Sequence, residues 1–567
     1  MGKACTFTVD RVLAATKGKT VASTFSDHVD VNCAGVLLSL PALLSNGLLR
    51  HSHEFKPDDG YYSVESIFIS LAFLSLLRAK TLSQSETVPC GELGRAIGLD
   101  RIPEVKTLRK RIERFCARTN IKKWALTLSK EWMSEHPDLA GILYVDGHIN
   151  PCYSKKNRMP KRFASRLRLC ISGSTDYWIN DCTGQPFFVV NEVIHGGMIE
   201  KIKKEIIPQL DKDVPNQPTP QMLEENLQLS RYMLVFDREG NSPEFFYDAW
   251  QQRIAVCTYC KNVKDVWPDE EFTPYEEVLD DGETVKVKLA ERGVLLKSTN
   301  GKKQIWCREI RKLSKSGHQT SIITTNFIMK IVMIGVYMFA RWSQENFFKY
   351  MMKHFNIDGL VSYFKEQVDD TKILVNPAYR KLEGELKKYN GKLTRKKAEF
   401  ATLTLKEHDI EEKKMKKYLA KKSETLEEIE QLNNLTLAVK MKMKDTERKI
   451  TFAQLPENEK FTNAINIRKN FMDTVKIIAY RSETAMGNIV KKHMGHPDEA
   501  RNLIRQICQT DADIKPDYEN KTLTIFLHKL NHWKDDKVVE ILCEELNETE
   551  TKFPCTDLVI IYKMVSS

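Results

Sequence analysis

The stretch GILYVDGHIN, residues 141–150, is a short apolar run that ends in an aspartate, Asp146. A second run of the same kind, RYMLVFDREG at residues 231–240, ends in Asp237. Short apolar runs of this type, bounded by polar and turn residues, are typical of buried β-strands. Both aspartates are therefore expected at strand ends, where loops begin and where catalytic side chains are commonly placed.

The segments around these two runs alternate between strand and helix patterns. Residues 165–181 and 186–193 alternate like antiparallel strands, and residues 199–210 form an amphipathic pattern typical of a helix. Ser242 and Pro243 then open a further helix, before an apolar strand at residues 254–260. The order β-β-β-α-β-α-β predicts an α/β fold with an RNase H-like catalytic core, in which a mixed sheet is flanked by helices.

The length of 567 residues is too great for one hydrophobic core, so several domains are expected. Composition and periodicity change along the chain and define six segments. We predict a helical N-terminal part at residues 1–135, the first part of the core at 136–260, a β-rich insertion at 261–320, completion of the core by the Glu345 helix at 321–375, long charged helices at 376–450, and a C-terminal helical region with a short strand pair at 451–567.

Two segments outside the core carry concentrated positive charge. Residues 91–115 contain a helix, a break at Gly98 and a basic second helix opening at Pro103, which resembles a DNA-binding helix-turn-helix. A helical pair with a solvated basic face explains this segment equally well. Residues 381–450 contain 19 Lys or Arg and 13 Asp or Glu on long helical or coiled-coil patterns. The pattern favours a solvated structural hairpin there, and an arm that embraces DNA or a second subunit is the alternative.

The overall charge and the cysteine pattern restrict the class of protein. A net charge of +11 favours a polyanionic partner, most commonly nucleic acid. The most apolar stretch, residues 331–340, is about half the length that spans a bilayer, so no membrane role is expected. Thirteen scattered cysteines predict reduced thiols in a cytoplasm. Cys257 and Cys260 could form half a zinc site, but a buried pair of small apolar side chains is favoured.

The acidic residues suggest a chemistry. Phosphoryl transfer without an organic cofactor commonly uses two divalent ions, which activate the attacking and the leaving oxygen. Such hard cations take oxygen ligands, so the protein must supply convergent carboxylates. Asp146 and Asp237 follow strands that would be neighbours in the core, and Glu345 lies on a helix able to cross the sheet edge. We therefore expect these three residues to be both catalytic and metal-binding.

The segments YVDGH, VFDREG and RWSQENFFK resemble the three acidic motifs of bacterial insertion-sequence DDE transposases. The subgroup suggested has a β-rich insertion before the last glutamate and a Y-R-E-K signature around it. Arg341 stands four residues before Glu345, as that signature requires. Its tyrosine position holds Met338, with Tyr337 beside it. Its lysine position holds methionine, and Lys349 and Lys353 flank that position.

The resemblance implies cutting at the ends of a mobile element and joining of the freed 3′-hydroxyl to target DNA. It also implies two Mg²⁺ ions per site, with Mn²⁺ as a substitute, and double-stranded DNA partners, namely the terminal inverted repeats and the target. A homodimer on DNA and a cytoplasmic, nucleoid-associated location follow from the same resemblance. Residues expected to contact DNA or its phosphates are Arg341, Lys349, Lys353, Tyr337, His148, Arg238, Lys161 and Arg162.

Several alternatives stay open from the sequence. His148 could touch the scissile phosphate or make a local structural hydrogen bond. The basic cluster that includes Lys161 and Arg162 favours DNA backbone contact over a plain solvated loop, because it follows Asp146 closely. The same carboxylates would serve a DDE-type nuclease that performs no strand transfer. A domesticated, catalytically silent DNA-binding protein is the third hypothesis.

Overall fold

The computed structural model describes most of the chain, with short gaps. The described residues are 7–57, 60–152, 161–164, 169–192, 197–261, 263, 265–278, 284–357, 365–366, 370–371, 373–403, 412–456, 463–464 and 466–565. The chain divides into two compact units. The larger contains Met1–Tyr153, Lys161–Phe364 and Ala464–Ser567, and the smaller contains Ser154–Pro160 and Lys365–Asn463.

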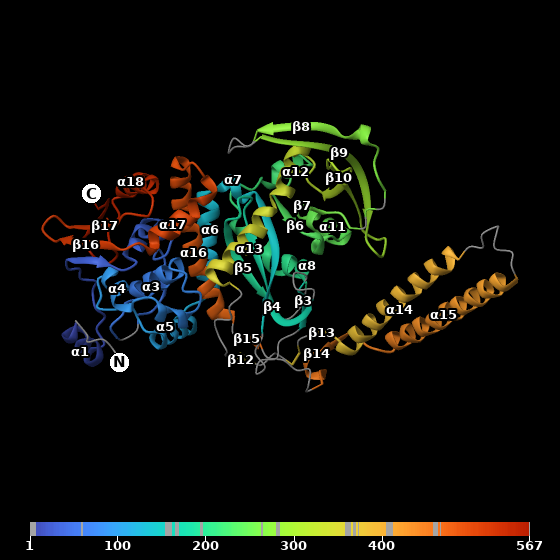
Figure 1. The fold of residues 1–567 in the computed structure, drawn as a ribbon, viewed down its shortest axis with the longest axis horizontal. Coiled ribbons are helices and arrows are strands. Elements are labelled where there is room, and N and C mark those ends of the chain that lie inside the picture. The colour runs from blue at the N-terminus through green and yellow to red at the C-terminus, as the bar shows by residue number, and fades with distance from the viewer. Residues whose placement is uncertain are drawn as a thin grey trace. The chain divides into compact units, whose positions relative to one another are not determined.

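A mixed ten-stranded sheet forms the centre of the larger unit (Figure 1). Six of its strands come from the predicted core. They are β2 (Ile142–Pro151), β3 (Lys161–Ala164), β4 (Leu169–Asn180), β5 (Pro186–Glu192), β6 (Tyr232–Phe236) and β7 (Ile254–Tyr259). β5, β4 and β2 pair antiparallel in that order, whereas β2, β6 and β7 pair parallel. The spatial order is therefore β5-β4-β2-β6-β7, with β3 also paired to β4.

The two aspartates are placed by different local structures. β6 ends at Phe236, so Asp237 directly follows a strand as predicted. β2 instead continues past Asp146 to Pro151, which corrects the prediction that this strand ends at the aspartate. The strand continues because residues after Asp146 still pair with β4, from His148 opposite Asp176 to Pro151 opposite Gly173.

The residues between β7 and the next long helices extend the same sheet. Four antiparallel strands follow one another: β8 (Thr273–Val278), β9 (Thr284–Lys297), β10 (Gln304–Leu313) and β11 (Gln319–Thr324). β11 pairs antiparallel with β7, so this β-rich segment is continuous with the core strands. The two parts therefore share backbone hydrogen bonds.

The Glu345 helix predicted within residues 321–375 is two helices. α12 (Ile331–Ala340) ends at Arg341, and α13 (Trp342–Phe355) begins immediately after it. α11 (Pro243–Gln251) begins as predicted, with the Ser242 hydroxyl accepting a hydrogen bond from the Phe245 amide and Pro243 in the first turn. None of the described helices combines the length and the apolar character needed to cross a membrane.

Both ends of the chain contribute to one core in the larger unit. α16 (Asn466–Val490) packs against α3 (Val64–Leu76), α6 (Ile121–Glu135) and β5. Phe471 of α16 stacks on Trp124 at a centroid distance of 5.6 Å and meets Phe68 edge-on at 5.5 Å. The N-terminal β1 (His28–Val31) also pairs with the C-terminal β16 (Ala512–Asp517). Segments more than 400 residues apart are therefore packed together.

The structure contains a strand pair in the C-terminal region and a pair of helices around Gly98. β17 (Thr522–Leu527) and β18 (Val559–Met564) pair with each other, in parallel, which confirms the predicted strand pair. α4 (Cys90–Ala96) and α5 (Val105–Arg118) flank Gly98, whose φ of +69° suits glycine. The second helix opens at Val105 rather than Pro103, because Glu104 keeps an extended backbone.

The smaller unit is a helical hairpin on a short strand pair. β13 (Ile373–Val375) and β14 (Lys449–Thr451) pair antiparallel, and α14 (Pro377–Thr402) packs along α15 (Glu412–Lys444) (Figure 1). These helices occupy the segment predicted to hold long charged helices.

Candidate active site

Asp146 and Asp237 are positioned by two neighbouring parallel strands. Val145 of β2 is in register with Phe236 of β6, so each aspartate comes one residue after a paired position. Burial raises the pKa of the Asp146 carboxyl from its ordinary value of 3.8 to about 6. Arg341 lowers this pKa, and the negative charges of Asp237 and Glu345 raise it. The charges of both other predicted acids therefore act on the Asp146 carboxyl.

Arg341 connects the sheet to the helix that carries Glu345. Its Nη1 lies 3.4 Å from Asp146 Oδ2, and its Nη2 lies 3.4 Å from Glu345 Oε1. Arg341 occupies the junction between α12 and α13, so the helix break places its guanidinium between the two carboxylates. The side chain of Asp146 is 18% exposed and that of Glu345 is 44% exposed, which leaves the cluster open on the helix side.

The loop after β6 fixes the carboxylate of Asp237. Its Oδ1 accepts a hydrogen bond of 2.7 Å from the Glu239 amide, and its carbonyl accepts one of 2.8 Å from the Thr258 hydroxyl on β7. A Cβ at Gly240 would lie 2.3 Å from the ring of Phe236. Glycine is required at this position because the chain turns directly over that ring.

Aromatic contacts hold α13 on the sheet. The His148 ring of β2 stacks on Phe348 at a centroid distance of 5.1 Å and an interplanar angle of 17°. Trp178 of β4 meets Phe347 edge-on at 5.3 Å. The Tyr144 hydroxyl also donates a 2.5 Å hydrogen bond to the Tyr337 carbonyl of α12. These contacts fix the position from which Glu345 faces Asp146.

The remaining predicted contact residues lie in different environments. Lys349 and Lys353 are exposed on α13, four and eight residues after Glu345, and therefore on the same side of the helix. Arg238 is exposed in the loop after Asp237, with its guanidinium 5.9 Å from the centroid of the Tyr259 ring. His148 is buried, and Tyr337 is half-buried on α12.

Lys161 and Arg162 are placed by backbone pairing alone. They lie on β3, opposite Ser172 and Ile171 of β4. Their side chains lie outside the described part of the structure. Most of the basic cluster that follows Asp146, residues 153–160 and 165–168, also lies outside the described residues.

Packing in the core accounts for Met338 at the tyrosine position of the signature. Met338 is fully buried, and its Sδ lies 3.8 Å from Cys257 Sγ. A tyrosine hydroxyl there would need a polar partner in an apolar cluster.

Cys257 and Cys260 lie in different apolar surroundings. Cys257 packs in the apolar cluster that contains Met338, whereas Cys260 packs against the other core cluster. Burial raises the pKa of the Cys257 thiol to about 12, so it stays protonated. The pair therefore has the apolar role that the sequence favoured, and its members belong to different clusters.

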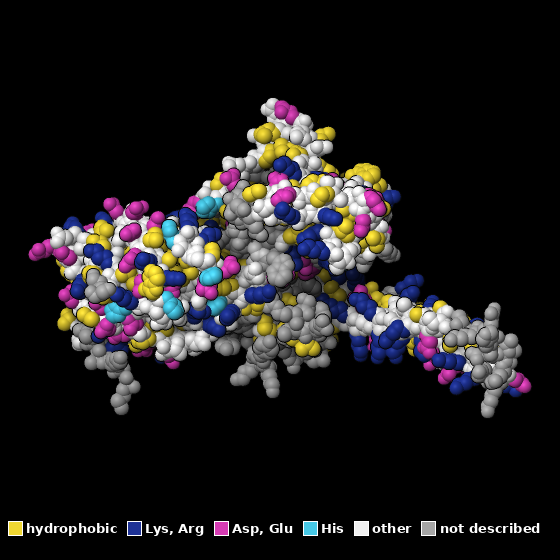
Figure 2. All heavy atoms as spheres, turned by 45° about the horizontal axis from the view of Figure 1, so that its top comes forward, with side chains coloured by type: hydrophobic (Ala, Val, Ile, Leu, Met, Phe, Trp, Pro, Cys, Tyr) yellow, Lys and Arg dark blue, Asp and Glu magenta, His cyan; other side chains and the backbone are white. Residues whose placement is uncertain are grey.

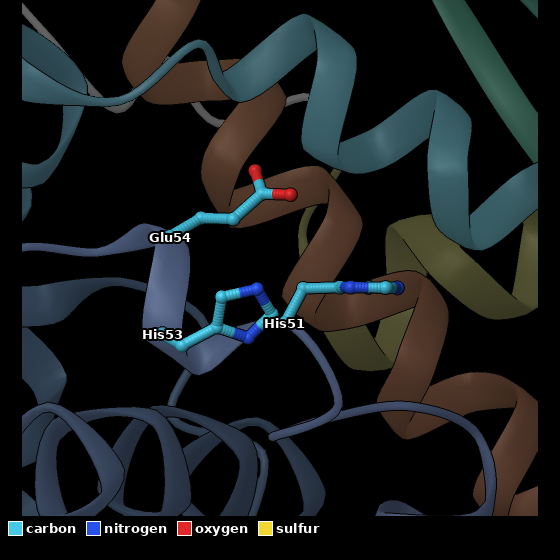
Figure 3. Close-up of side chains that lie close together, drawn as sticks. All are labelled: His51, His53 and Glu54. Carbon is cyan, nitrogen blue, oxygen red and sulfur yellow. The ribbon is translucent and has the colours of Figure 1, made fainter.

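Two groups of possible metal ligands were not predicted. His51, His53 and Glu54, shown in Figure 3, offer ligand atoms within 4.8 Å of one another. His51 Nε2 pairs with Glu131 at 2.7 Å, and the same carboxylate pairs with Arg50 at 2.7 Å, so this group belongs to a surface ion-pair network. The close spacing of His51, His53 and Glu54 in the sequence could have indicated this group.

The second group joins distant segments. It contains Asp30, Asp513 and His528, which meet only through the pairing of β1 with β16. Sequence spacing therefore gave no signal for it. Among the described residues, the oxygens of Asp146, Asp237 and Glu345 do not all lie within 4.8 Å of one another, and Arg341 lies between Asp146 and Glu345.

The family of the chain is shown by its sequence over nearly its full length. A family model described as transposase protein matches residues 2–566. The chain belongs to this transposase family. Among curated proteins, none matches the chain. The family match confirms the resemblance to transposases, and family membership indicates a DNA-processing enzyme. Assignment to the DDE, Y-R-E-K-type subgroup and to bacterial insertion sequences stays a prediction.

Proposed function

We propose that this transposase is a DDE enzyme that cuts at the ends of an insertion element and joins the freed 3′-hydroxyl to target DNA. Asp146, Asp237 and Glu345 are its catalytic carboxylates in this proposal. One observation carries it: Arg341 contacts Asp146 and Glu345, while the charge of Asp237 acts on Asp146. This contact and the register of β2 with β6 support a shared site for three acids that are distant in sequence.

The topology supports an RNase H-like core. The order β5-β4-β2-β6-β7 places three antiparallel strands beside three parallel ones, with β2 shared by both sets. The first two acids lie on β2 and directly after β6, the central neighbours of this order. The third acid comes from a helix packed on the sheet through Phe347 and Phe348. This is the arrangement expected of such a core.

The donor set of the site fits Mg²⁺. All three groups are carboxylates, the ligand type preferred by hard divalent cations, and burial together with the charges of Asp237 and Glu345 raises the pKa of Asp146. We propose that Asp146, Asp237 and Glu345 hold two Mg²⁺ ions, with Mn²⁺ as a substitute. Bound ions of this kind neutralise charge on the attacking and leaving oxygens of a phosphodiester.

The protein's own residues position the DNA. When divalent cations occupy the carboxylates, the guanidinium of Arg341 becomes available to a phosphate oxygen beside Glu345. Lys349 and Lys353 extend that positive charge along the exposed side of α13. Arg238, Tyr337, Lys161 and Arg162 are proposed to make further DNA contacts. Because His148 stacks on Phe348, it fits the role of holding α13 better than that of touching the phosphate.

The partners in this proposal are double-stranded DNA from the element's terminal inverted repeats and from the target. Two ends must be cut and joined together, so a homodimer on DNA is proposed. A cytoplasmic, nucleoid-associated site of action belongs to the same proposal.

The decisive experiment uses the full chain, Mg²⁺ and a labelled duplex carrying the element's own terminus. Asp146→Asn, Asp237→Asn and Glu345→Gln are each expected to reduce cleavage by a factor of about 1,000 or more, because each removes a charged ligand. Asp138→Asn, at an exposed acid shortly before β2, is the matched control and should cleave like the native chain. Undiminished cleavage by Asp146→Asn would reject the assignment.

Adding an unlabelled target plasmid separates the related functions. Joined products support transposition, cleavage without joined products indicates the nuclease, and binding without cleavage indicates a catalytically silent protein. Mn²⁺ should replace Mg²⁺, whereas Ca²⁺ should support binding better than cutting. A rate with Ca²⁺ equal to that with Mg²⁺ would contradict the proposed metal chemistry.

A further inference from the structure

One side of α14 in the smaller unit carries an exposed row of cations, which we call the basic stripe. Its members share one helix face, at spacings of one, three, four and seven residues. They are Arg380, Lys381, Lys387, Lys388, Lys392 and Arg395. At a rise of about 1.5 Å per residue, the stripe extends over roughly 22 Å. Figure 2 shows Lys and Arg side chains gathered on this helical hairpin.

The basic stripe faces away from the packing surface of α14. Leu382, Leu386 and Leu393 are half-buried on the face that packs along α15. Lys396, which lies near that face, pairs with Glu399 at 3.0 Å and with Glu428 of α15 at 2.6 Å. Folding of the hairpin therefore uses the cation nearest to α15 and leaves the stripe outside.

The stripe carries an excess of positive charge. Among the residues that the structure describes, no carboxylate forms an ion pair with any of its six members. The exposed acids of the hairpin include Glu424, Glu427 and Glu430, which lie on the other helix. On α14 itself the six cations of the stripe outnumber the two half-buried acids that lie among them in the sequence, Glu383 and Glu385. Uncompensated cations on one face are strongly repelled from one another, and a polyanion relieves that repulsion.

Two glycines lie within the stripe. Gly384 and Gly391 are exposed, seven residues apart, and a Cβ at either position would meet no atom within 4 Å. Glycine inside a helix costs about 1 kcal/mol relative to alanine, and neither position needs glycine for internal packing. The Gly391 carbonyl accepts a 3.2 Å hydrogen bond from Arg395 Nε, but neither glycine places a side chain between the cations, so a partner can approach the helix closely.

We propose that the basic stripe of α14 binds the phosphate backbone of duplex DNA. This inference rests on the proposed function, and it identifies which surface outside the catalytic site holds the DNA. A stripe of this length spans several phosphates of a duplex, and each phosphate contact releases condensed counterions. The contacts are to the backbone, so the stripe contributes affinity and orientation without reading sequence.

The test measures binding of the full chain to a 30-base-pair duplex of unrelated sequence, in EDTA, across a range of salt concentrations. One variant replaces Lys381, Lys387, Lys388 and Lys392 with alanine. The control removes the same charge from four exposed lysines of the larger unit: Lys491, Lys492, Lys534 and Lys537. The stripe variant should bind about 10-fold or more weakly, with a salt slope shallower by about 0.9 per lost phosphate contact. Equal losses in both variants would overturn the proposal.

A second variant tests close approach without changing charge. The double substitution Gly384→Leu and Gly391→Leu should increase helix content by circular dichroism, because leucine is a better helix former than glycine. The same substitutions should weaken duplex binding several-fold, since the side chains would hold the phosphates away. Unchanged affinity for the duplex would show that DNA does not approach the α14 backbone closely at these two positions.

The partner and the catalytic proposal are tested independently. Binding to vesicles of acidic phospholipid, with no binding to the duplex, would overturn DNA as the partner. Because the binding assay contains no divalent metal and needs no cleavage, its failure leaves the catalytic assignment untouched. Conversely, undiminished cleavage by Asp146→Asn would reject the catalytic assignment without changing the stripe result.

Discussion

The Arg341 guanidinium lies 3.4 Å from the Asp146 carboxylate, although 195 residues separate the two in the chain. The contact exists because Arg341 stands at the break between α12 and α13, against the exposed side of β2. Its second terminal nitrogen reaches Glu345 at the same distance. A protein cation therefore neutralises part of a carboxylate cluster that we propose to hold metal ions.

Removing this cation should change the acidity of the site. Arg341→Gln removes a positive charge that lowers the pKa of Asp146, so that pKa should rise above about 6. The acidic limb of the pH profile for cleavage should move to higher pH, and the rate should fall by about 10-fold or more. Arg341→Lys should restore the position of the acidic limb in part. Identical pH profiles for the native chain and Arg341→Gln would contradict this role.

The raised pKa of Asp146 also predicts a dependence of stability on pH. A carboxyl that titrates near 6 in the folded chain and near 3.8 when unfolded stabilises the fold at low pH and loses this contribution as pH rises through 6. Asp146→Asn cannot ionise. In EDTA, Asp146→Asn should therefore become more stable relative to the native chain as the pH rises from 4 to 8. The difference between the two free energies of unfolding should grow by up to about 3 kcal/mol. Denaturant unfolding of both proteins at several pH values measures this.

Asp138→Asn is the control for that series, because Asp138 is exposed. Its stability difference from the native chain should stay flat across the same pH range. Added Mg²⁺ should stabilise the native chain and not Asp146→Asn. A constant difference between Asp146→Asn and the native chain at every pH would show that the carboxyl is not perturbed.

Glu483 should be essential for the position of α13. Its side chain is fully buried on α16, where it pairs with Arg78 at 2.7 Å and with Arg501 at 3.4 Å, and accepts a hydrogen bond from the Tyr350 hydroxyl of α13. Glu483→Gln leaves two partly buried arginines, Arg78 and Arg501, without their buried counter-charge, which should cost about 3 kcal/mol in unfolding free energy. Thermal or denaturant unfolding checks this, with Glu499→Gln at an exposed site as the control. A loss no larger than that of the control would refute it.

Lys469 should be required for a buried charge cluster between α16 and the sheet. Its Nζ lies 2.7 Å from Asp176 of β4 and 2.6 Å from Asp473. Burial raises the pKa of the Asp473 carboxyl, and Lys469 opposes that rise. Lys469→Met removes the cation that two buried carboxylates share, although Asn150 and Asn191 still donate hydrogen bonds to Asp176. We expect a loss of about 3–5 kcal/mol in unfolding free energy near pH 8.

That loss should shrink at pH 5, because protonation then relieves the repulsion between the two carboxylates. Urea unfolding at both pH values measures the effect. Lys491→Met, at an exposed position, is the matched control and should change stability little at either pH. A loss that is the same at pH 5 and pH 8 would show that charge repulsion is not its cause.

Local patterns predicted the parts of the site well. The apolar runs before Asp146 and Asp237 are buried strands, and Ser242 with Pro243 opens a helix. These features depend on hydrophobic periodicity and on capping, which act between residues close in sequence. The strand-like segments after β7 are also strands, although their pairing with β7 could not be read from their pattern.

The errors occurred where local signals were insufficient. The apolar and aromatic run of residues 326–355 has a helical pattern, and neither glycine nor proline stands at Arg341 to mark the break between α12 and α13. The continuation of β2 beyond Asp146 depends on hydrogen bonds to β4, which the residues of β2 do not encode by themselves. Burial of His148 depends on Phe348, which lies 200 residues away in the chain.

The sequence by itself determined which residues are acidic, where the strands that carry Asp146 and Asp237 begin, and that the chain belongs with transposases. Hydrophobic periodicity and short motifs are sufficient for this because each involves residues near one another in the chain. Only the tertiary structure decided that Arg341 lies between Asp146 and Glu345, and that both ends of the chain share one core. Those relationships depend on strand pairing and side-chain packing between distant segments, and these form only when the whole unit folds.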